Sequence, residues 1–296
     1  GKGSFGAVVL AQRRGDPEKV FALKAINKTA IGDPRHRRRL QAERLVLDSL
    51  PPSVFVARLD LAFQTRDELF YLMEYCPGGS LKYQLGRVFS CGVDRLKDGQ
   101  ARIWICELVV AIEHLHFHGF VHRDIKSDNV MFDVHGHCKL IDFDLCKRIR
   151  RGPALLRLRA QQQARLESQL GGQLIQNQRQ KAAATRARAP AERGPAALSS
   201  CVLPEPMSPC GSLAFVAPEM LSDPRGAMGS FAGDWWGLGA VACEILAGKL
   251  PWRSLEAGGG VGGGGGQEDK LHTEVKAGVL PALPAFLTPE AEALVT

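Results

Sequence analysis

One stretch, residues 122–144 with the sequence HRDIKSDNVMFDVHGHCKLIDFD, constrains this chain more than any other. It carries a carboxylate at Asp124, a cation at Lys126 and an amide at Asn129, and a second carboxylate follows at Asp142. Phosphoryl transfer from a nucleotide requires a carboxylate that orients the acceptor hydroxyl, a cation near the transferred group and oxygen ligands for Mg²⁺. The residue types and their order therefore indicate phosphoryl-transfer chemistry.

The segments between these residues predict a β-hairpin. Val130–Asp133 and Cys138–Ile141 are short apolar runs, and a Val-His-Gly-His turn separates them. A hairpin would hold Asn129 and Asp142 at neighbouring ends of its strands, where both can serve one Mg²⁺ ion. The alternative is that the His-Arg-Asp and Asp-Phe sequences are chance matches within a hairpin.

Glycines open the chain, at Gly1, Gly3 and Gly6 of GKGSFG. Glycines let backbone N–H groups approach phosphate oxygens closely, because no Cβ stands in the way. In a dinucleotide-binding turn they would open a helix, whereas Ala7–Gln12 continues as a strand pattern and Val20–Ile26 follows as a second strand. The start of the chain therefore favours a phosphate-binding hairpin, and a plain hairpin is the alternative.

In this order and spacing the motifs resemble those of the eukaryotic protein kinases. The matching motifs are G-x-G-x-x-G-x-V at residues 1–8, H-R-D-x-K-x-x-N at 122–129, D-F at 142–143 and A-P-E at 217–219. Asp144 departs from the family, in which Gly follows the Asp-Phe pair.

The resemblance implies an α+β fold, the bilobal protein kinase fold, with a small β-rich N-lobe and a large helical C-lobe. The N-lobe is predicted at residues 1–75, up to the hinge, and the C-lobe at 76–296. Residues 257–266 are rich in glycine and predict a flexible loop, and Thr288–Thr296 starts a helix. Because the chain begins at the glycine loop and ends before the family's last large-lobe helices, we expect a fragment that is incomplete at both ends.

The resemblance also implies ATP and Mg²⁺ as cofactors and assigns roles to individual residues. Asp124, Lys126 and Asn129 are the implied catalytic residues, and Asn129 and Asp142 are the implied metal ligands. The implied ATP-binding residues are Gly1, Gly3, Gly6, Val8, Ala22, Lys24, Glu43, Met73, Glu74 and Cys76.

Lys24 lies in a strand, VFALKAI, that is similar to the V-A-I-K strand of the family. A helix is predicted at Arg35–Leu50, and the resemblance pairs its Glu43 with Lys24. The alternative is that Glu43 is a solvated residue on a charged helix.

The hinge is implied at the end of the predicted strand Glu68–Tyr75. Met73 is the implied gatekeeper beside the nucleotide, and a plain core position is its alternative. Glu74 and Cys76 would offer backbone groups to adenine.

Residues 147–208 differ in composition from the rest of the chain. They hold twelve Lys and Arg against three Glu, so this segment accounts for the net charge of +7. We predict a basic, mostly disordered insertion within the activation segment. Nucleic-acid binding is the alternative, but no aromatic residue interrupts the basic run, so nucleic acid is not an expected partner.

The implied regulatory residues surround the activation segment. Ser208 stands where related kinases carry an activating phosphorylation, and Arg123 of the His-Arg-Asp motif is the implied receiver of that phosphate. Ser212 occupies the position of a Ser/Thr that binds the catalytic Asp and Lys. The resemblance thus implies an upstream activating kinase, and an activator protein outside this fragment.

Substrate choice is implied by four positions in the large lobe. Lys126 favours Ser/Thr over Tyr acceptors. Asp128 and Glu244 match acids that receive upstream Arg in basophilic kinases of the AGC group, whereas a third such position is Ser80. We therefore expect protein substrates with a basic but relaxed preference upstream of the acceptor.

The expected function is an active Ser/Thr protein kinase of the AGC group. The alternative is a pseudokinase or nucleotide-binding scaffold, because Asp144 replaces Gly. Gly233–Trp236, the HRDIKSDN and DFDLC sequences and the basic insertion together look most like the NDR/LATS branch, and Greatwall-like kinases are the nearest rival.

Composition limits the remaining classes. No apolar run approaches the roughly 18 residues of a membrane helix, so no membrane is an expected partner. The eight Cys show no metal-ligand spacing and predict reduced thiols of an intracellular protein, cytoplasmic or nuclear.

Overall fold

A computed structural model describes residues 2–3, 6–92, 96, 98–149, 213–222, 231–252 and 265–277. All elements below belong to one compact unit, formed by residues 1–149 together with 207–296. Among the described helices, none is both long and apolar enough to span a membrane. The regulatory residues Ser208 and Ser212, Gly1 of the glycine loop and the helix predicted at Thr288–Thr296 lie outside the described residues.

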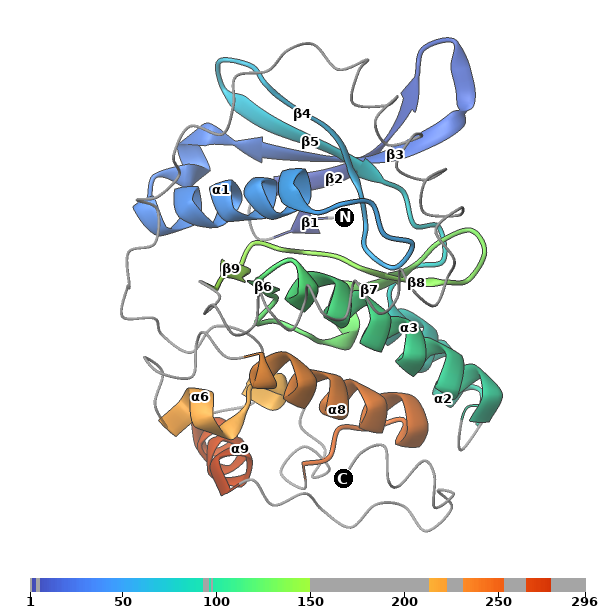
Figure 1. The fold of residues 1–296 in the computed structure, drawn as a ribbon, viewed down its shortest axis with the longest axis vertical. Helices are drawn as coiled ribbons and strands as arrows, with labels where there is room; N and C mark the ends of the chain where they lie inside the picture. The colour runs from blue at the N-terminus through green and yellow to red at the C-terminus, as the bar shows by residue number, and fades with distance from the viewer. Residues whose placement is uncertain are drawn as a thin grey trace, which may run out of the picture. The chain divides into compact units, whose positions relative to one another are not determined.

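An antiparallel five-stranded sheet forms the first part of the chain, with strand order β1-β2-β3-β5-β4 (Figure 1). Its strands are β1 Lys2–Gly3, β2 Gly6–Arg13, β3 Asp16–Asn27, β4 Leu59–Gln64 and β5 Glu68–Glu74. The predicted strands at 7–12 and 68–75 are therefore confirmed within one residue at each end, and the strand predicted at 20–26 is confirmed as part of β3, which begins four residues earlier.

Helix α1, Pro34–Ser49, follows the 3₁₀ turn η1, Lys28–Ile31, and packs against this sheet. Its Leu40 belongs to a buried cluster with Ile26 and Tyr71. The Tyr71 hydroxyl donates to the Leu40 carbonyl oxygen at 3.0 Å, which fixes the helix on strand β5. The prediction of a helix over 35–50 is confirmed.

The second part of the chain is mainly helical, and α3 packs beside α8 (Figure 1). Its helices are α2 Leu81–Ser90, α3 Asp98–Phe117, α6 Pro218–Ser222, α8 Ala232–Ala247 and α9 Gly265–Ala277. Its short elements are β6 Phe120–Val121, η2 Ser127–Asn129, β7 Val130–Phe132, β8 Cys138–Leu140, β9 Lys147–Arg148 and η3 Leu213–Phe215. Fully buried Leu108, Ile112, Val241 and Ile245 lie in the core between α3 and α8.

Two predicted boundaries were wrong. The insertion was placed from residue 147, but Lys147 and Arg148 form β9, which pairs with β6. The flexible glycine-rich loop near the end of the chain was predicted at 257–266, but Gly265 already begins α9. At residue 147, pairing with the neighbouring strand β6 outweighs the basic composition on which the prediction depended. At Gly265, the run of good helix formers that follows outweighs the glycine-rich composition.

The hairpin of β7 and β8 connects the two parts of the chain. Leu140 N donates to Phe55 O at 2.9 Å, and Ala57 N donates to Leu140 O at 3.0 Å. Gly78, just after the sheet, donates to Phe132 O at 3.0 Å. A side chain at Gly78 would bring its Cβ to 2.6 Å from the Phe132 Cβ, so only glycine allows this approach.

Candidate functional site

Lys24 and Glu43 form a bidentate contact between the sheet and α1. The Lys24 Nζ atom lies 2.8 and 2.9 Å from the two carboxylate oxygens of Glu43. The Glu43 side chain is only 2% exposed. Burial opposes the charge of Lys24, but the carboxylates of Glu43, Asp142 and Asp144 together outweigh burial, and the pKa of Lys24 is raised. The predicted pair is therefore present, and the Lys is held charged at the sheet surface.

The predicted nucleotide-binding side chains share one face of the sheet. Val8 pairs directly with Lys24 across β2 and β3, and Ala22 pairs with Met73 across β3 and β5. Directly opposed residues of an antiparallel pair point to the same face, as do residues two apart in one strand. The register therefore places Val8, Ala22, Lys24 and Met73 together.

The glycine loop is the connection of β1 and β2. Gly3 pairs with Gly6, and β2 continues from there as a strand that carries Val8. For Gly3 and Gly6, the prediction of a hairpin, and not of a helix start, is confirmed.

The hinge is fixed by contacts with both parts of the chain. Glu74 N donates to Arg58 O at 2.9 Å, and the Glu74 carboxylate accepts from Lys139 Nζ of β8 at 2.7 Å. Cys76 is buried, and burial, with the Glu74 charge nearby, raises the pKa of its thiol to about 12. The thiol of Cys76 is thus neutral and serves only in packing. The backbone of Cys76, and not its side chain, is the part that can act at the hinge.

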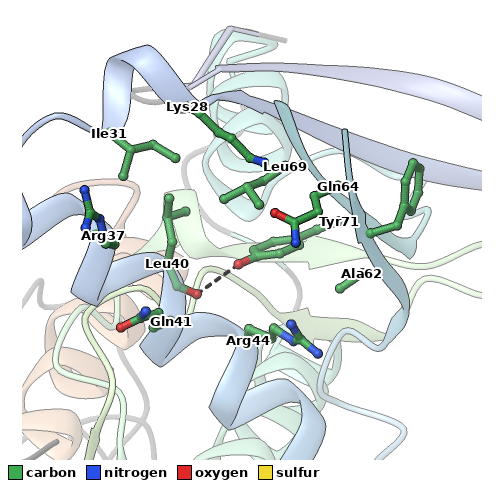
Figure 2. Close-up of a pocket in the computed structure, with 11 residues that line it drawn as sticks. Lys28, Ile31, Arg37, Leu40, Gln41, Arg44, Ala62, Gln64, Leu69 and Tyr71 are labelled. Atoms are coloured by element: carbon green, nitrogen blue, oxygen red, sulfur yellow. Dashed lines mark hydrogen bonds between the residues drawn. The ribbon is translucent and has the colours of Figure 1, made fainter. Parts of the chain in front are cut away.

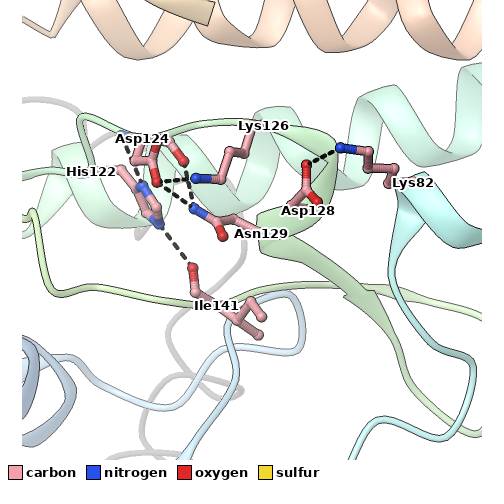
Figure 3. A network of polar contacts seen from close by, with 7 residues as sticks. All are labelled: Lys82, His122, Asp124, Lys126, Asp128, Asn129 and Ile141. Atoms are coloured by element: carbon pink, nitrogen blue, oxygen red, sulfur yellow. Dashed lines mark hydrogen bonds and ion pairs between the residues drawn. The ribbon is translucent and has the colours of Figure 1, made fainter. Parts of the chain in front are cut away.

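The catalytic stretch holds Asp124 by one oxygen and leaves the other without a partner (Figure 3). Asp124 Oδ2 accepts from Lys126 Nζ at 2.6 Å and from Asn129 Nδ2 at 2.9 Å. Asn129 Nδ2 also donates to the Asp124 carbonyl oxygen at 2.9 Å. Asp124 Oδ1 is buried and has no hydrogen-bond partner among the described residues. Because a buried carboxylate oxygen without a donor is costly, this atom is suited to accept a hydroxyl proton from a bound molecule.

Asn129 and Asp142 lie at neighbouring ends of the hairpin, as predicted. Ile141 N donates to Asn129 O at 3.0 Å, and Val130 pairs with Leu140. Asp142 has a φ of 63°, a region that non-glycine residues seldom adopt, so the fold holds its backbone in a strained conformation.

These two residues fit a magnesium ion. The Asn129 amide donates both of its hydrogen bonds to Asp124 through its nitrogen, which leaves its oxygen available as a ligand. Mg²⁺ is usually bound by one or two protein oxygens together with substrate phosphates and water, and not by a full protein cage.

Asp144, the departure from the family motif, lies close to these charges. Burial and the charges of Asp142 and Glu43 raise its pKa to about 6, while Lys24 opposes the rise. Its φ is not positive, so the missing Gly costs no backbone strain here. The preceding Phe143 is 1% exposed and meets the His122 ring edge-on at 5.3 Å. The Asp-Phe pair is therefore packed normally around the substituted position.

Asp234 of α8 anchors the catalytic stretch by its backbone. Its carboxylate accepts from His122 N at 2.8 Å and from Arg123 N at 2.7 Å. His116 Nε2 lies 2.7 Å from the same carboxylate. Asp234 is 1% exposed, so these contacts are shielded from water. Asp234 thus fixes two backbone amides of the catalytic loop, and the sequence analysis did not foresee the part of His116.

The side chain of Arg123 contacts the segment that leads into β9. Its Nε donates to Leu145 O at 2.6 Å, and its φ is 69°. Burial and the Arg123 charge lower the pKa of Lys147. Two cations thus stand close together at the start of the activation segment, an arrangement that an anion would stabilise.

The two predicted substrate acids differ in their surroundings. Asp128 is exposed and pairs with Lys82 Nζ of α2 at 3.1 Å. Glu244 lies on α8, and its Oε2 is covered without a hydrogen-bond partner among the described residues. The sequence analysis did not foresee the cation at Asp128.

Glu107 is a positioning residue that the sequence analysis missed. This buried carboxylate of α3 accepts from Cys138 N at 2.8 Å and contacts His137 Nδ1 at 2.6 Å. It therefore fixes β8 of the hairpin that carries Asn129 and Asp142 at its ends. The available signal was an acid on an otherwise apolar helix face beside Trp104 and Leu108.

A separate cavity of about 460 Å³ lies between α1, β4 and β5 (Figure 2). Figure 2 shows Leu40, Leu69 and Tyr71 within it and the cations Lys28, Arg37 and Arg44 around it. None of the predicted ATP, metal or catalytic residues lines it. The cavity is therefore distinct from the catalytic stretch.

Comparison with known proteins agrees with the geometry. The family model of the protein kinase domain matches residues 1–164, more than half of the chain. The chain belongs to the protein kinase domain family. The matched region contains the glycine loop, Lys24, Glu43, Asp124 and Asp142.

The curated relatives of this kinase domain include two protein kinases C and one serine/threonine-protein kinase. Protein kinase C of Drosophila melanogaster is 30% identical over 86% of this chain and 26% of that protein. The serine/threonine-protein kinase AtPK2/AtPK19 of Arabidopsis thaliana is 28% identical over 99% of this chain and 47% of that protein. Protein kinase C delta type of Mus musculus is 28% identical over 99% of this chain and 33% of that protein. The chain thus spans a quarter to a half of the length of these relatives.

Proposed function

We propose that this kinase domain transfers the γ-phosphoryl group of Mg·ATP to Ser or Thr hydroxyls of protein substrates. The observation that carries the proposal is Asp124, whose Oδ2 is held by Lys126 and Asn129 while Oδ1 is buried and without a partner. A carboxylate with one fixed and one available oxygen is the group that orients an acceptor hydroxyl. Radiolabelled transfer from ATP to protein tests the reaction.

In this mechanism each residue has one task. Asp124 Oδ1 accepts the hydrogen bond of the acceptor hydroxyl and then its proton. Lys126, held 2.6 Å from Asp124 Oδ2, places a positive charge beside the transferred group. Lys24, fixed by Glu43, binds phosphate oxygens of the nucleotide. Asn129 and Asp142 would hold Mg²⁺, which would supply positive charge to offset the charge of the phosphates.

Nucleotide binding gives the first prediction. Mg·ATP is expected to raise the melting temperature, because a ligand that binds only the folded state stabilises it, by roughly 2.7 kcal/mol at 100 times Kd. Without Mg²⁺ the rise should be small. Lys24→Met and Asp142→Asn should reduce the rise with Mg·ATP to a small fraction, as measured by differential scanning fluorimetry.

The control for this prediction is Lys19→Met, since Lys19 is on the same strand but is 61% exposed and pairs with the surface acid Asp16. It should keep the full rise. An undiminished Mg·ATP effect in both Lys24→Met and Asp142→Asn contradicts the assigned site.

A pseudokinase is the second candidate function, and Asp144 is the observation that favours it. Its carboxyl group lies beside Asp142, and the two acids raise the local negative charge where a triphosphate would bind. The packing of Phe143 and the intact Lys24–Glu43 pair favour the active alternative. Nucleotide binding without phosphoryl transfer would distinguish the pseudokinase.

Membership of the AGC group and of its NDR/LATS branch is the finer part of the proposal. It is supported by HRDIKSDN, by Gly233–Trp236 and by the basic composition that begins near residue 147. The protein kinase C relatives are compatible with the wider group. An intracellular place, cytoplasmic or nuclear, is part of the same proposal, and the six free cysteines among the described residues support it.

Regulation by phosphate at Ser208 gives the second prediction. A phosphoserine adds about −1.5 to −2 charges, and Arg123 with Lys147 forms a cationic pair suited to receive them. Ser208→Ala should lower kcat/KM several-fold, whereas deletion of Gly152–Ala197 should leave activity. An upstream activating kinase and an activator protein are the partners that this switch requires.

Phosphate mapping of the active protein, together with the activity of Ser208→Ala, checks this switch. Full activity of Ser208→Ala with an unmodified Ser208 in the active wild type would show that regulation does not use this residue.

The substrates proposed are proteins with basic residues upstream of the acceptor Ser or Thr. Support comes from Asp128, which lies within the catalytic stretch, and from Glu244 of α8. A peptide library that selects acidic or proline-directed sites would contradict this preference.

A further inference from the structure

An ion pair lies beside the catalytic carboxylate. Figure 3 shows Lys82 reaching from α2 to Asp128, which stands in the sequence between Lys126 and Asn129. The Lys82 Nζ atom is 3.1 Å from Asp128 Oδ2, and the two side chains are 59% and 45% exposed. A peptide that presents a hydroxyl to Asp124 therefore meets an acid that the chain already pairs with its own cation.

The position of Lys82 in helix α2 is unfavourable for a positive charge. It occupies the first turn of α2, where the backbone dipole disfavours a positive charge. That turn contains no acidic residue, and Ser80 caps it by accepting from Tyr83 N at 3.2 Å. The favourable partner of Lys82 is Asp128, which lies 46 residues away in the sequence.

Glu244 extends the cluster to a third element. Burial raises the pKa of Glu244, while Ser127 and Lys82 oppose the rise and Asp128 adds to it. Lys82 thus acts on both acids. The covered Glu244 Oε2 has no donor among the described residues, and a guanidinium is a donor that pairs well with a carboxylate in such a place.

We propose that Lys82 is a specificity-determining residue, which occupies Asp128 before substrate binds and competes with a basic side chain of the incoming peptide. This inference rests on the proposed function, because it concerns the peptide that reaches Asp124. Exposed ion pairs are weak, so a substrate cation can displace Lys82, but it gains less than it would at a free acid. The preferred substrates are then proteins in which upstream basic residues are favoured only slightly.

Equilibrium binding tests the proposal without requiring phosphoryl transfer. Two fluorescent peptides with one Ser acceptor are compared, one with Arg at the second and third positions before it and one with Ala there. Fluorescence anisotropy gives each Kd with Mg²⁺ and a non-hydrolysable ATP analogue, using the 296-residue chain. The ratio of the two Kd values measures the advantage of arginine in wild type, Lys82→Ala and Lys82→Ala/Asp128→Asn.

Lys82→Ala should increase the arginine advantage by about three- to fivefold, the size of one exposed ion pair. The double variant should lose this increase, and 0.5 M salt should reduce it. Arg87→Ala is the matched control, since Arg87 is an exposed cation on the same helix that faces Tyr83. An unchanged ratio in Lys82→Ala, or the same change in Arg87→Ala, overturns the proposal. Absence of transfer with an increased ratio would instead contradict only the proposed function.

Discussion

Asp124→Asn is expected to lower kcat for peptide phosphorylation by about 10²–10⁴-fold, with little change in the KM for ATP. The amide keeps an oxygen and the volume of the side chain, but it cannot take the proton of the acceptor hydroxyl. The melting temperature should change little, because the amide oxygen can keep the two hydrogen bonds of Oδ2 while the amide nitrogen takes the place of Oδ1, which has no partner to lose. Steady-state kinetics with radiolabelled ATP measures the effect.

Asp67→Asn provides the matched control, since Asp67 is an exposed acid with no catalytic role assigned to it. It should retain wild-type kcat. If Asp124→Asn keeps more than about a tenth of wild-type kcat, Asp124 is not the catalytic carboxylate, since removing a positioned general base costs at least 10²-fold.

Asp234→Ala is expected to lower the free energy of unfolding by about 3–5 kcal/mol. The substitution leaves the amides of His122 and Arg123 buried without their acceptor, and it removes the partner of His116. Activity should fall as well, because the catalytic stretch loses the anchor of its backbone. Urea unfolding followed by tryptophan fluorescence measures the loss.

Two further variants keep this prediction testable if the Ala protein does not fold. Asp234→Asn retains one acceptor oxygen and should show a smaller loss, with faster hydrogen exchange at the His122 and Arg123 amides. Asp48→Ala removes an exposed acid paired with Arg44 and should cost less than about 1 kcal/mol. An Asp234→Ala loss no larger than that of Asp48→Ala contradicts the anchoring role.

Much of the candidate site was predictable because its functional residues lie in short sequence motifs. Asp124, Lys126 and Asn129 occupy one loop, so their mutual distances follow largely from local chain geometry. The strand pattern around Lys24 and the helix pattern around Glu43 were also local. Their pairing came from the resemblance, because no local rule brings together residues 19 apart.

What the sequence could not show are contacts between distant segments. Glu107 fixes the hairpin through His137, and Lys82 reaches Asp128 from another helix. Such pairs depend on how α2 and α3 pack on the catalytic stretch, and residue types alone do not encode that packing. The start of the basic insertion was misplaced for the same reason, since Lys147 and Arg148 are basic in composition but form β9, whose partner β6 lies elsewhere in the chain.

The most direct test of the proposed kinase function is phosphoamino acid analysis after incubation with radiolabelled ATP, Mg²⁺ and a basic protein substrate. The substrate should carry phosphoserine and phosphothreonine but no phosphotyrosine, and the label should vanish with Asp124→Asn or without Mg²⁺. Stabilisation by Mg·ATP without any labelled substrate, in this chain and in a longer form of the protein, would contradict the account and leave a nucleotide-binding pseudokinase.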